Sequence, residues 1–134
     1  MARASNFSGI EDYLTTAGEE ICLLVQVENR KGLAALDDIL AVEGIDGVFI
    51  GPADLAADLG YIDNPNAEEV QTTVLDTMKK IVASGKAGGI LTLDETLQTQ
   101  CRDIGARFIA TEIDVTLFAK NMREAASRAA KHLS

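Results

Sequence analysis

Two polar side chains stand at the end of an apolar run, where they could act together on a ligand. If Ile21–Glu28 is a strand, its side chains alternate between two faces, and Leu24, Gln26 and Glu28 share one of them. Parallel α/β proteins place their active-site groups at the carboxyl ends of strands. The position therefore predicts a functional role for Gln26 and Glu28. The competing interpretation is that Glu28 begins a solvated loop and Gln26 forms a core hydrogen bond.

A second carboxylate follows the next apolar run. In the segment Phe49–Leu55, a turn made by Gly51 and Pro52 leads directly to Asp54. Glycine lets the backbone approach a ligand closely, and proline stiffens the turn. The alternative role of Asp54 is purely structural, as the N-cap of a short helix over Leu55–Leu59.

The chemistry that these two carboxylates favour is the binding of a hard divalent cation. Consecutive strands usually lie next to each other, so Glu28 and Asp54 can converge. Two carboxylates, completed by water and substrate oxygens, suit Mg²⁺ or Mn²⁺. Zinc suits the sequence less well, because the single histidine, His132, lies near the C-terminus on a predicted helix. A Ser/His/Asp triad is excluded for the same reason.

The elements that must position these residues alternate between short apolar runs and stretches with helical periodicity. The predicted strands are Ile21–Glu28, Gly47–Gly51, Gly89–Leu93 and Arg107–Thr111. The predicted helices are Ile10–Thr16, Lys31–Val42, Ala67–Ser84, Glu95–Ile104 and Val115–His132. Strands that alternate with helices in this way indicate parallel βα units.

Helix ends carry recognisable signals. Asp94 and Asp114 stand just before predicted helices, where an N-cap acceptor is expected, and Gly85 stands where a helix needs a left-handed C-terminal residue. Ser8 and Glu11 have the spacing of a capping box for the first short helix.

Four βα units are compatible with two architectures. One is an open, doubly wound sheet, and the other is half of an eight-stranded barrel, since a whole barrel needs about 250 residues. The glycine-rich phosphate turn typical of the open sheet does not follow the first predicted strand. The residues alone leave both architectures open.

Composition excludes several classes of protein. The chain has 134 residues with 47% hydrophobic and 25% charged residues, which is typical of one globular domain. Its apolar runs are too short to span a membrane, and no leader peptide is recognisable, so the cytoplasm is the expected location. The net charge is −9 and tryptophan is absent, which argues against nucleic-acid binding. The two cysteines, Cys22 and Cys101, lie in apolar patterns and are interpreted as reduced core thiols.

The two strand-end segments together resemble a known family. The segments Leu24–Arg30 and Val42–Gly60 are similar to the HpcH/HpaI aldolases, which are metal-dependent pyruvate aldolases, and the similarity continues to Ile113 and Asp114. The resemblance covers essentially the whole chain, but only the C-terminal half of such a protein. Residues 1–134 would form one half-barrel domain, strands five to eight of a TIM (β/α)₈ barrel, and Ala2–Ser5 would match the loop after strand four.

The resemblance implies an activity and a set of site residues. It implies a class II aldolase that cleaves 4-hydroxy-2-oxo acids to pyruvate and an aldehyde. Glu28 and Asp54 would be the metal ligands, with Mg²⁺, Mn²⁺ or Co²⁺ as the cation. Gln26 would hydrogen-bond the pyruvate, and the Ala53 backbone N–H, beside Asp54, would bind its carboxylate.

The sequence departs from the family pattern in two ways. The histidine and arginine that complete the reaction come from the first half of the barrel, and neither His132 nor Arg3 replaces them. Glu112 stands where the family commonly has glycine, so an extra carboxylate is expected at the rim. A half-barrel also predicts a homo-oligomer or pairing with a second half-barrel. The alternatives to an aldolase are a non-catalytic self-associating half-barrel and a small-metabolite-binding module.

Overall fold

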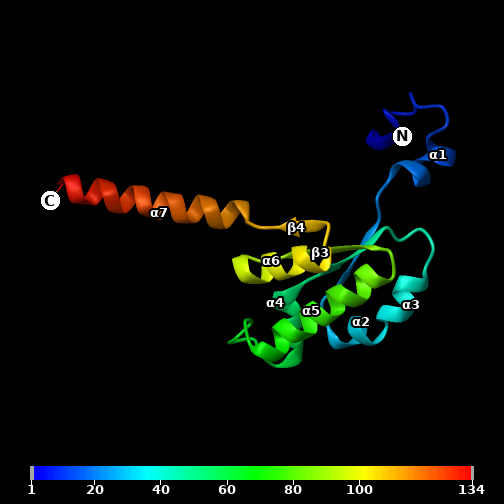
Figure 1. Ribbon diagram of the computed structural model, residues 1–134. Coiled ribbons are helices and arrows are strands. Elements are labelled where there is room, and N and C mark those ends of the chain that lie inside the picture. The colour runs from blue at the N-terminus through cyan, green and yellow to red at the C-terminus, as the bar shows by residue number, and fades with distance from the viewer. Residues whose placement is uncertain (1, 134) are drawn as a thin grey trace.

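A computed structural model describes residues 2–133, apart from the side chain of residue 133. Within these residues the chain forms a short 3₁₀ helix, seven α-helices and one four-stranded sheet (Figure 1). The strands are β1 (Leu24–Val27), β2 (Gly47–Ile50), β3 (Ala87–Leu91) and β4 (Phe108–Ala110). The helices are η1 (Arg3–Ser5), α1 (Tyr13–Glu20), α2 (Arg30–Ala34), α3 (Leu36–Ala41), α4 (Pro52–Leu59), α5 (Glu68–Ala83), α6 (Glu95–Ile104) and α7 (Asp114–Leu133).

The sheet is parallel throughout, and its strands follow the order of the chain, β1-β2-β3-β4. Each strand is connected to the next through at least one helix, which confirms the predicted βα units. One row of paired residues crosses the whole sheet and consists of Gln26, Phe49, Gly89 and Phe108. Because all strands run the same way, their carboxyl ends lie at one edge of the sheet.

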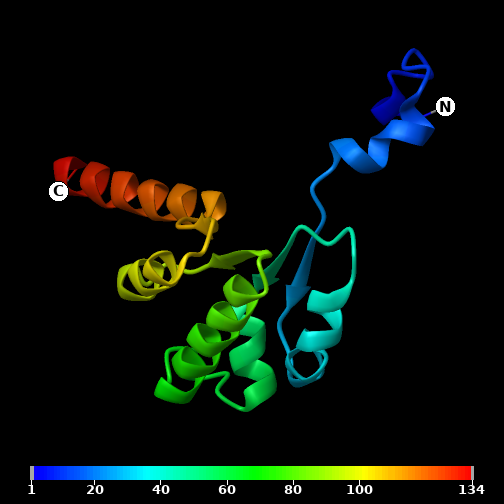
Figure 2. The same cartoon turned by 45° about the vertical axis from the view of Figure 1, so that its right-hand side comes forward.

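Helices α2 to α6 lie on one side of the sheet, and the core is between them and the strands (Figure 2). Val27 of β1, Ile50 of β2 and Ile90 of β3 are fully buried. From α5, Met78 and Ile81 are fully buried in the same cluster. These strand residues share one face by alternation, so the buried face is the one opposite Gln26 and Glu28.

The other face of the sheet is open. It carries Phe49 and Phe108, whose rings are in edge contact. Their centroids are 5.4 Å apart, and the angle between the ring planes is 61°. Gly89 lies between them in the paired row, and a Cβ there would collide with the Phe49 ring. Phe108 remains 50% exposed and Gln26 is also exposed. The apolar side chains of this face therefore lack the cover that the opposite face has.

Two segments project from this body. The segment with η1 and α1 lies to one side, joined through residues 21–23, and α7 extends away at the other end (Figures 1 and 2). In α7, Val115, Phe118 and Met122 are 54–68% exposed. Within the described residues, no helix is long and apolar enough to cross a membrane.

The edge of the sheet at the amino ends of the strands is held by one lysine. The Lys86 ammonium donates to the carbonyl oxygens of Val42 (3.0 Å) and Ile45 (2.6 Å), in the connection that leads into β2. The same connection is tied to the first strand, because the Leu23 N–H donates to Asp46 Oδ2 (2.6 Å). This lysine is therefore structural.

Several predicted ends and caps are corrected by the structure. The predicted capping box is wrong: α1 begins at Tyr13, and Ser8 has a left-handed φ of 74° with its N–H bonded to Ser5 Oγ. The predicted helix over residues 31–42 is two helices, because Ala35, with φ −90° and ψ 4°, separates α2 from α3. Cys22 is exposed because it precedes β1 outside the sheet, whereas Cys101 is buried as predicted.

Two other predicted helix ends are confirmed, and a third is shifted by one residue. Asp94 Oδ1 accepts from the N–H groups of Thr96 (2.8 Å) and Leu97 (3.2 Å), as an N-cap should. Gly85 follows α5 with a φ of 86°. Asp114 is the first residue of α7 rather than the residue before it, and its Oδ1 accepts from the next N–H.

Candidate metal and substrate site

The site is built from the last residues of β1. Gln26 and Glu28 point to the open face, as predicted by alternation, and Gln26 Nε2 donates to Glu28 Oε2 over 2.6 Å. Gln26 is exposed and Glu28 is half-buried. The exposure of Gln26 excludes the interpretation in which it forms a core hydrogen bond. The hydrogen bond to Glu28 uses one carboxylate oxygen and leaves the other available for a ligand.

The turn after β2 lies directly against this pair. Gly51 is buried, and its N–H donates to the Val27 carbonyl oxygen (3.1 Å). A Cβ on Gly51 would come within 2.8 Å of Gln26 Nε2 and 3.2 Å of Glu28 Oε2. Only glycine leaves room for these two side chains in the observed positions, so the sequence here is fitted to the polar pair.

Helix α4 begins at this turn and carries the other predicted residues. Pro52 is its first residue, so Ala53 and Asp54 lie in its first turn. The prediction that Asp54 caps a helix starting at Leu55 is wrong, because the helix starts three residues earlier with Gly51 as its N-cap. Backbone N–H groups in a first helical turn have no helical acceptor and favour an anion. The Ala53 N–H is therefore free to bind one.

The donor set fits a hard divalent cation. Among the residues that the structure describes, no three His, Cys, Asp or Glu side chains form a cluster that could hold a metal ion. The predicted ligands are the carboxylates of Glu28, which follows β1 and accepts from the neutral amide of Gln26, and of Asp54, in the first turn of α4; no hydrogen bond joins Glu28 and Asp54 within the described residues. This set leaves several coordination positions for water and substrate oxygens, which is typical of Mg²⁺ or Mn²⁺. The assignment of Glu28 and Asp54 as ligands stays a prediction.

An apolar cavity of about 310 Å³ borders the same helix terminus. Its wall includes Pro52 and Ala53 of α4, Val74 of α5, Leu91 of β3 and Ile113 after β4. Of the predicted site residues, Ala53 lines this cavity, whereas Gln26, Glu28 and Asp54 do not. The sequence analysis missed it, because its wall comes from side chains far apart in the chain that no local pattern connects.

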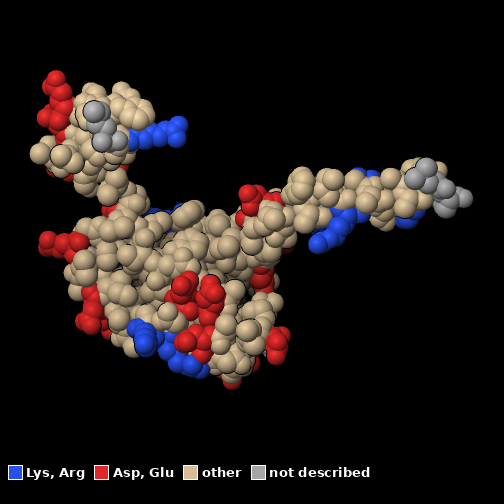
Figure 3. Space-filling view, turned by 180° about the vertical axis from the view of Figure 1, so that it is seen from behind, with Lys and Arg blue, Asp and Glu red and all other residues tan. Residues whose placement is uncertain are grey.

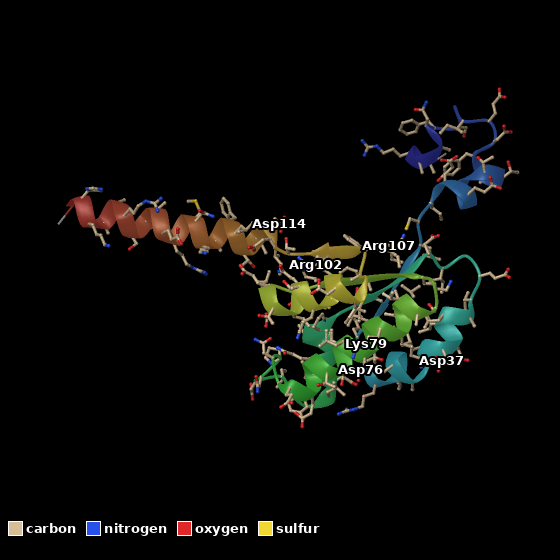
Figure 4. The ribbon with its side chains drawn as sticks, viewed as in Figure 1. Asp37, Asp76, Lys79, Arg102, Arg107 and Asp114 are labelled. Atoms are coloured by element: carbon tan, nitrogen blue, oxygen red, sulfur yellow. The ribbon has the colours of Figure 1, made fainter. Side chains whose placement is uncertain are left out.

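The remaining candidates lie apart from this edge or have structural roles. Glu112 follows β4 and is exposed, with no described partner, at the carboxyl edge. His132 is exposed near the far end of α7, and Arg3 is in η1. Surface charges such as Lys79 and Asp76 pair with each other (2.8 Å), as Figure 4 shows on α5.

Comparison with known proteins decides which family this site belongs to. Residues 3–121 match the family model described as HpcH/HpaI aldolase/citrate lyase. The chain belongs to the HpcH/HpaI aldolase/citrate lyase family. The match covers the sheet, the polar pair at the end of β1 and the α4 terminus, so the resemblance seen in the sequence is confirmed.

Individual proteins that are similar to this chain carry the names of aldolases. The chain is 50% identical over 124 residues to the hydroxypyruvate/pyruvate aldolase of Roseovarius nubinhibens, covering 92% of this chain and 48% of that protein. It is 47% identical over 128 residues to the 4-hydroxy-2-oxo-heptane-1,7-dioate aldolase of Escherichia coli, covering 96% and 49%. The chain therefore spans about half the length of the relatives that it matches.

A solved structure confirms the fold over nearly the whole of this chain. An HpcH/HpaI family protein from Burkholderia cenocepacia superposes with a TM-score of 0.85 at 34% identity. The superposition covers 96% of this chain and 50% of that one. The four parallel strands and their helices thus match about half of an HpcH/HpaI barrel, and the open-sheet alternative is excluded.

Proposed function

We propose that this chain supplies the metal-binding and pyruvate-binding half of a class II aldolase. The reaction is the cleavage of a 4-hydroxy-2-oxo acid to pyruvate and an aldehyde. The observation that carries the proposal is the contact of Gln26, Glu28 and Gly51 at the carboxyl edge of the sheet. Membership of the HpcH/HpaI family and the names of the aldolase relatives support the reaction class.

Each residue has a distinct role in this proposal. Glu28 and Asp54 hold a divalent cation, Mg²⁺ or Mn²⁺, which when bound supplies the positive charge that stabilises negative charge developing on the 2-oxo oxygen. Gln26 donates to the pyruvate oxygens, since Glu28 already fixes the orientation of its amide. The Ala53 N–H at the start of α4 binds the pyruvate carboxylate, where the helix terminus favours an anion.

We assign the aldehyde fragment to the apolar cavity that Ala53 lines. The apolar cavity that borders Ala53 is large enough for a small organic fragment. Among the described residues, His132 lies far along α7, and Arg30, which follows β1 at this edge, is paired with Asp58 (3.9 Å), so neither is assigned to the transfer of the proton at the aldehyde oxygen. We therefore expect slow pyruvate release from this chain by itself, and tight binding of metal and pyruvate.

Binding of Mn²⁺ tests the assignment directly. Glu28→Gln and Asp54→Asn should each weaken Mn²⁺ binding at least tenfold, measured by calorimetry or by electron paramagnetic resonance of free Mn²⁺. Asp76→Asn is the matched control, because Asp76 is exposed on α5 and pairs only with Lys79. Retention of full Mn²⁺ affinity by both site variants would show that the ligand assignment is wrong.

Pyruvate release separates the enzyme from its alternatives. The assay is the coupled reduction of pyruvate with added Mn²⁺ and a 4-hydroxy-2-oxo acid. Release that is lost in Glu28→Gln supports the aldolase. Metal binding without any release supports a non-catalytic half-barrel or a metabolite-binding module.

A further inference from the structure

Asp58 of α4 is bonded to the segment that follows Glu28. Its Oδ2 accepts the Arg30 N–H over 2.8 Å, and Arg30 is the first residue of α2. A backbone N–H at the start of a helix has no acceptor within that helix, so Asp58 supplies the acceptor from another element. Among the described residues, no other side-chain hydrogen bond joins α4 to residues 28–30. The Asp58 carboxylate therefore links α4 to the residues that follow β1.

The guanidinium of Arg30 adds little to this link. Its Nη1 lies 3.9 Å from Asp58 Oδ2, and 61% of the Arg30 side chain and 41% of the Asp58 side chain are exposed. An exposed ion pair at this distance is screened by solvent and contributes little to stability. The short bond to the backbone N–H, rather than the charge of Arg30, therefore determines where this segment lies against α4.

Three residues of the α4 segment share one face, namely Gly51, which is the N-cap, and Asp54 and Asp58 within the helix. They are spaced by three and four residues, which places side chains on one side of a helix. The first and the last both contact the end of β1 and its continuation. A Cβ on Gly51 would come within 3.2 Å of Glu28 Oε2, and Asp58 binds the Arg30 N–H. Asp54 lies between these two contacts, so its side of α4 is directed toward the residues after β1.

The core holds α4 through a different side of the helix. Leu55 and Ala56 are fully buried, whereas Asp54 and Asp58 are exposed. Burial of apolar surface is non-directional, but a hydrogen bond requires a defined distance and angle. The bond of Asp58 therefore adds a directional constraint on the rotation of α4 about its axis. The direction of the Asp54 carboxylate depends on that rotation.

We propose that Asp58 is a positioning residue for the metal site. By accepting the Arg30 N–H, its carboxylate fixes α4 in the rotation that turns Asp54 toward Glu28. Asp58 itself does not bind the cation. This inference rests on the proposed function, because it takes Glu28 and Asp54 as the metal ligands. Loss of a group that orients a ligand from outside the coordination sphere typically costs about 10- to 100-fold in metal affinity.

The first test is the affinity for Mn²⁺, measured by electron paramagnetic resonance of the free ion. Asp58→Ala should weaken binding about 10- to 100-fold, because the Arg30 N–H loses its acceptor. Asp58→Asn should retain nearly the full affinity, since its amide oxygen can accept the same bond. Arg30→Ala is the matched control, because it removes the guanidinium but keeps the N–H, and it should not weaken binding. Urea denaturation of each variant checks that it is folded.

Two outcomes of this titration would overturn the proposal. An equal loss of affinity in Asp58→Ala and Asp58→Asn would mean that Asp58 acts through its charge. Full affinity in Asp58→Ala, when Glu28→Gln loses affinity, would mean that Asp58 does not position the ligands, and the proposed function would stand. Absence of Mn²⁺ binding by the unmodified chain would count against the proposed function, and the second test then decides the role of Asp58.

The second test uses no metal. Glu28→Cys and Asp54→Cys are combined with Cys22→Ser, and a short bifunctional thiol reagent should join the two new thiols within one chain. Cys101 is buried, and burial raises the pKa of its thiol to about 11, so it should not react. Addition of Asp58→Ala should slow the cross-link several-fold, whereas Asp58→Asn should leave its rate nearly unchanged. Equal rates with and without Asp58→Ala would overturn the proposal.

Discussion

Gly51 is the residue on which the geometry of the candidate site depends most directly. Its backbone conformation, φ −101° and ψ 88°, can be adopted by residues other than glycine, so the turn itself does not require glycine here. What requires glycine is the close approach of the Gln26 and Glu28 side chains. The two polar groups and the glycine therefore form one unit, although they come from different strands.

A single methyl group at this position tests that unit. Gly51→Ala should lower Mn²⁺ affinity about tenfold, because the added Cβ would lie 2.8 Å from Gln26 Nε2 and displace it. Gly18→Ala is the matched control, since nothing lies within 4 Å of a Cβ there. Titration of both variants with Mn²⁺ measures the effect. Unchanged affinity in Gly51→Ala would show that this contact does not shape the metal site.

At the residue scale, the sequence predicts where a side chain lies when its position depends on a single strand. Alternation along one strand placed Gln26 and Glu28 on one face, and the structure confirms it. The contact of this pair with Gly51 depends on which strand lies beside β1, and the apolar cavity depends on several separate segments of the chain. Neither has a signal within a single stretch of sequence. The exposure of Cys22 was missed for a similar reason, since an apolar segment lies outside the sheet when no strand pairs with it.

At the scale of elements, helix α6 shows why some ends are predictable. It runs over Glu95–Ile104, as predicted, because Asp94 caps its first turn and Gly105 ends it with a φ of 113°. Strand ends are less predictable, because they depend on pairing with another segment. Strand β3 begins at Ala87, two residues before the predicted start, where Gly47 of β2 supplies its partner.

The cap of α6 also gives a stability prediction. Asp94→Ala should reduce the free energy of unfolding by about 1 kcal/mol, because the Thr96 and Leu97 N–H groups lose their acceptor. Asp94→Asn should retain most of the stability, since asparagine caps nearly as well. Urea denaturation at one protein concentration measures both. A loss in Asp94→Asn as large as in Asp94→Ala would point to charge rather than capping.

At the scale of the whole molecule, charge is distributed unevenly between the first part of the chain and the rest. Residues 1–76 hold 3 basic and 15 acidic side chains, whereas residues 77–134 hold 9 and 6. Acidic side chains spread over the body on the face seen in Figure 3, and basic ones also lie along α7.

The βα rhythm predicted parallel units but not a barrel, because an open sheet has the same rhythm. The match to half of a solved HpcH/HpaI barrel decided between them.

Exposure along α7 gives a prediction about the whole molecule. Phe118→Ala should change the free energy of unfolding by less than about 0.5 kcal/mol, because this side chain is 68% exposed in the single chain. Ile81→Ala, in the core, should cost about 2–5 kcal/mol. Both are measured by urea denaturation. A loss above about 1.5 kcal/mol in Phe118→Ala would show that another surface buries α7 in solution.

The lysine at the amino edge of the sheet has a practical consequence. Lys86 and Asp46 fasten the connection into β2 on the side of the sheet away from Glu28 and Asp54. The predicted metal ligands and the anchoring lysine therefore lie at opposite rims of the same strands. A peptide inserted between Ser84 and Lys86 or near Gly44 would separate the Lys86 ammonium from the two carbonyl oxygens that it holds, so these turns should stay intact when the protein is tagged or labelled.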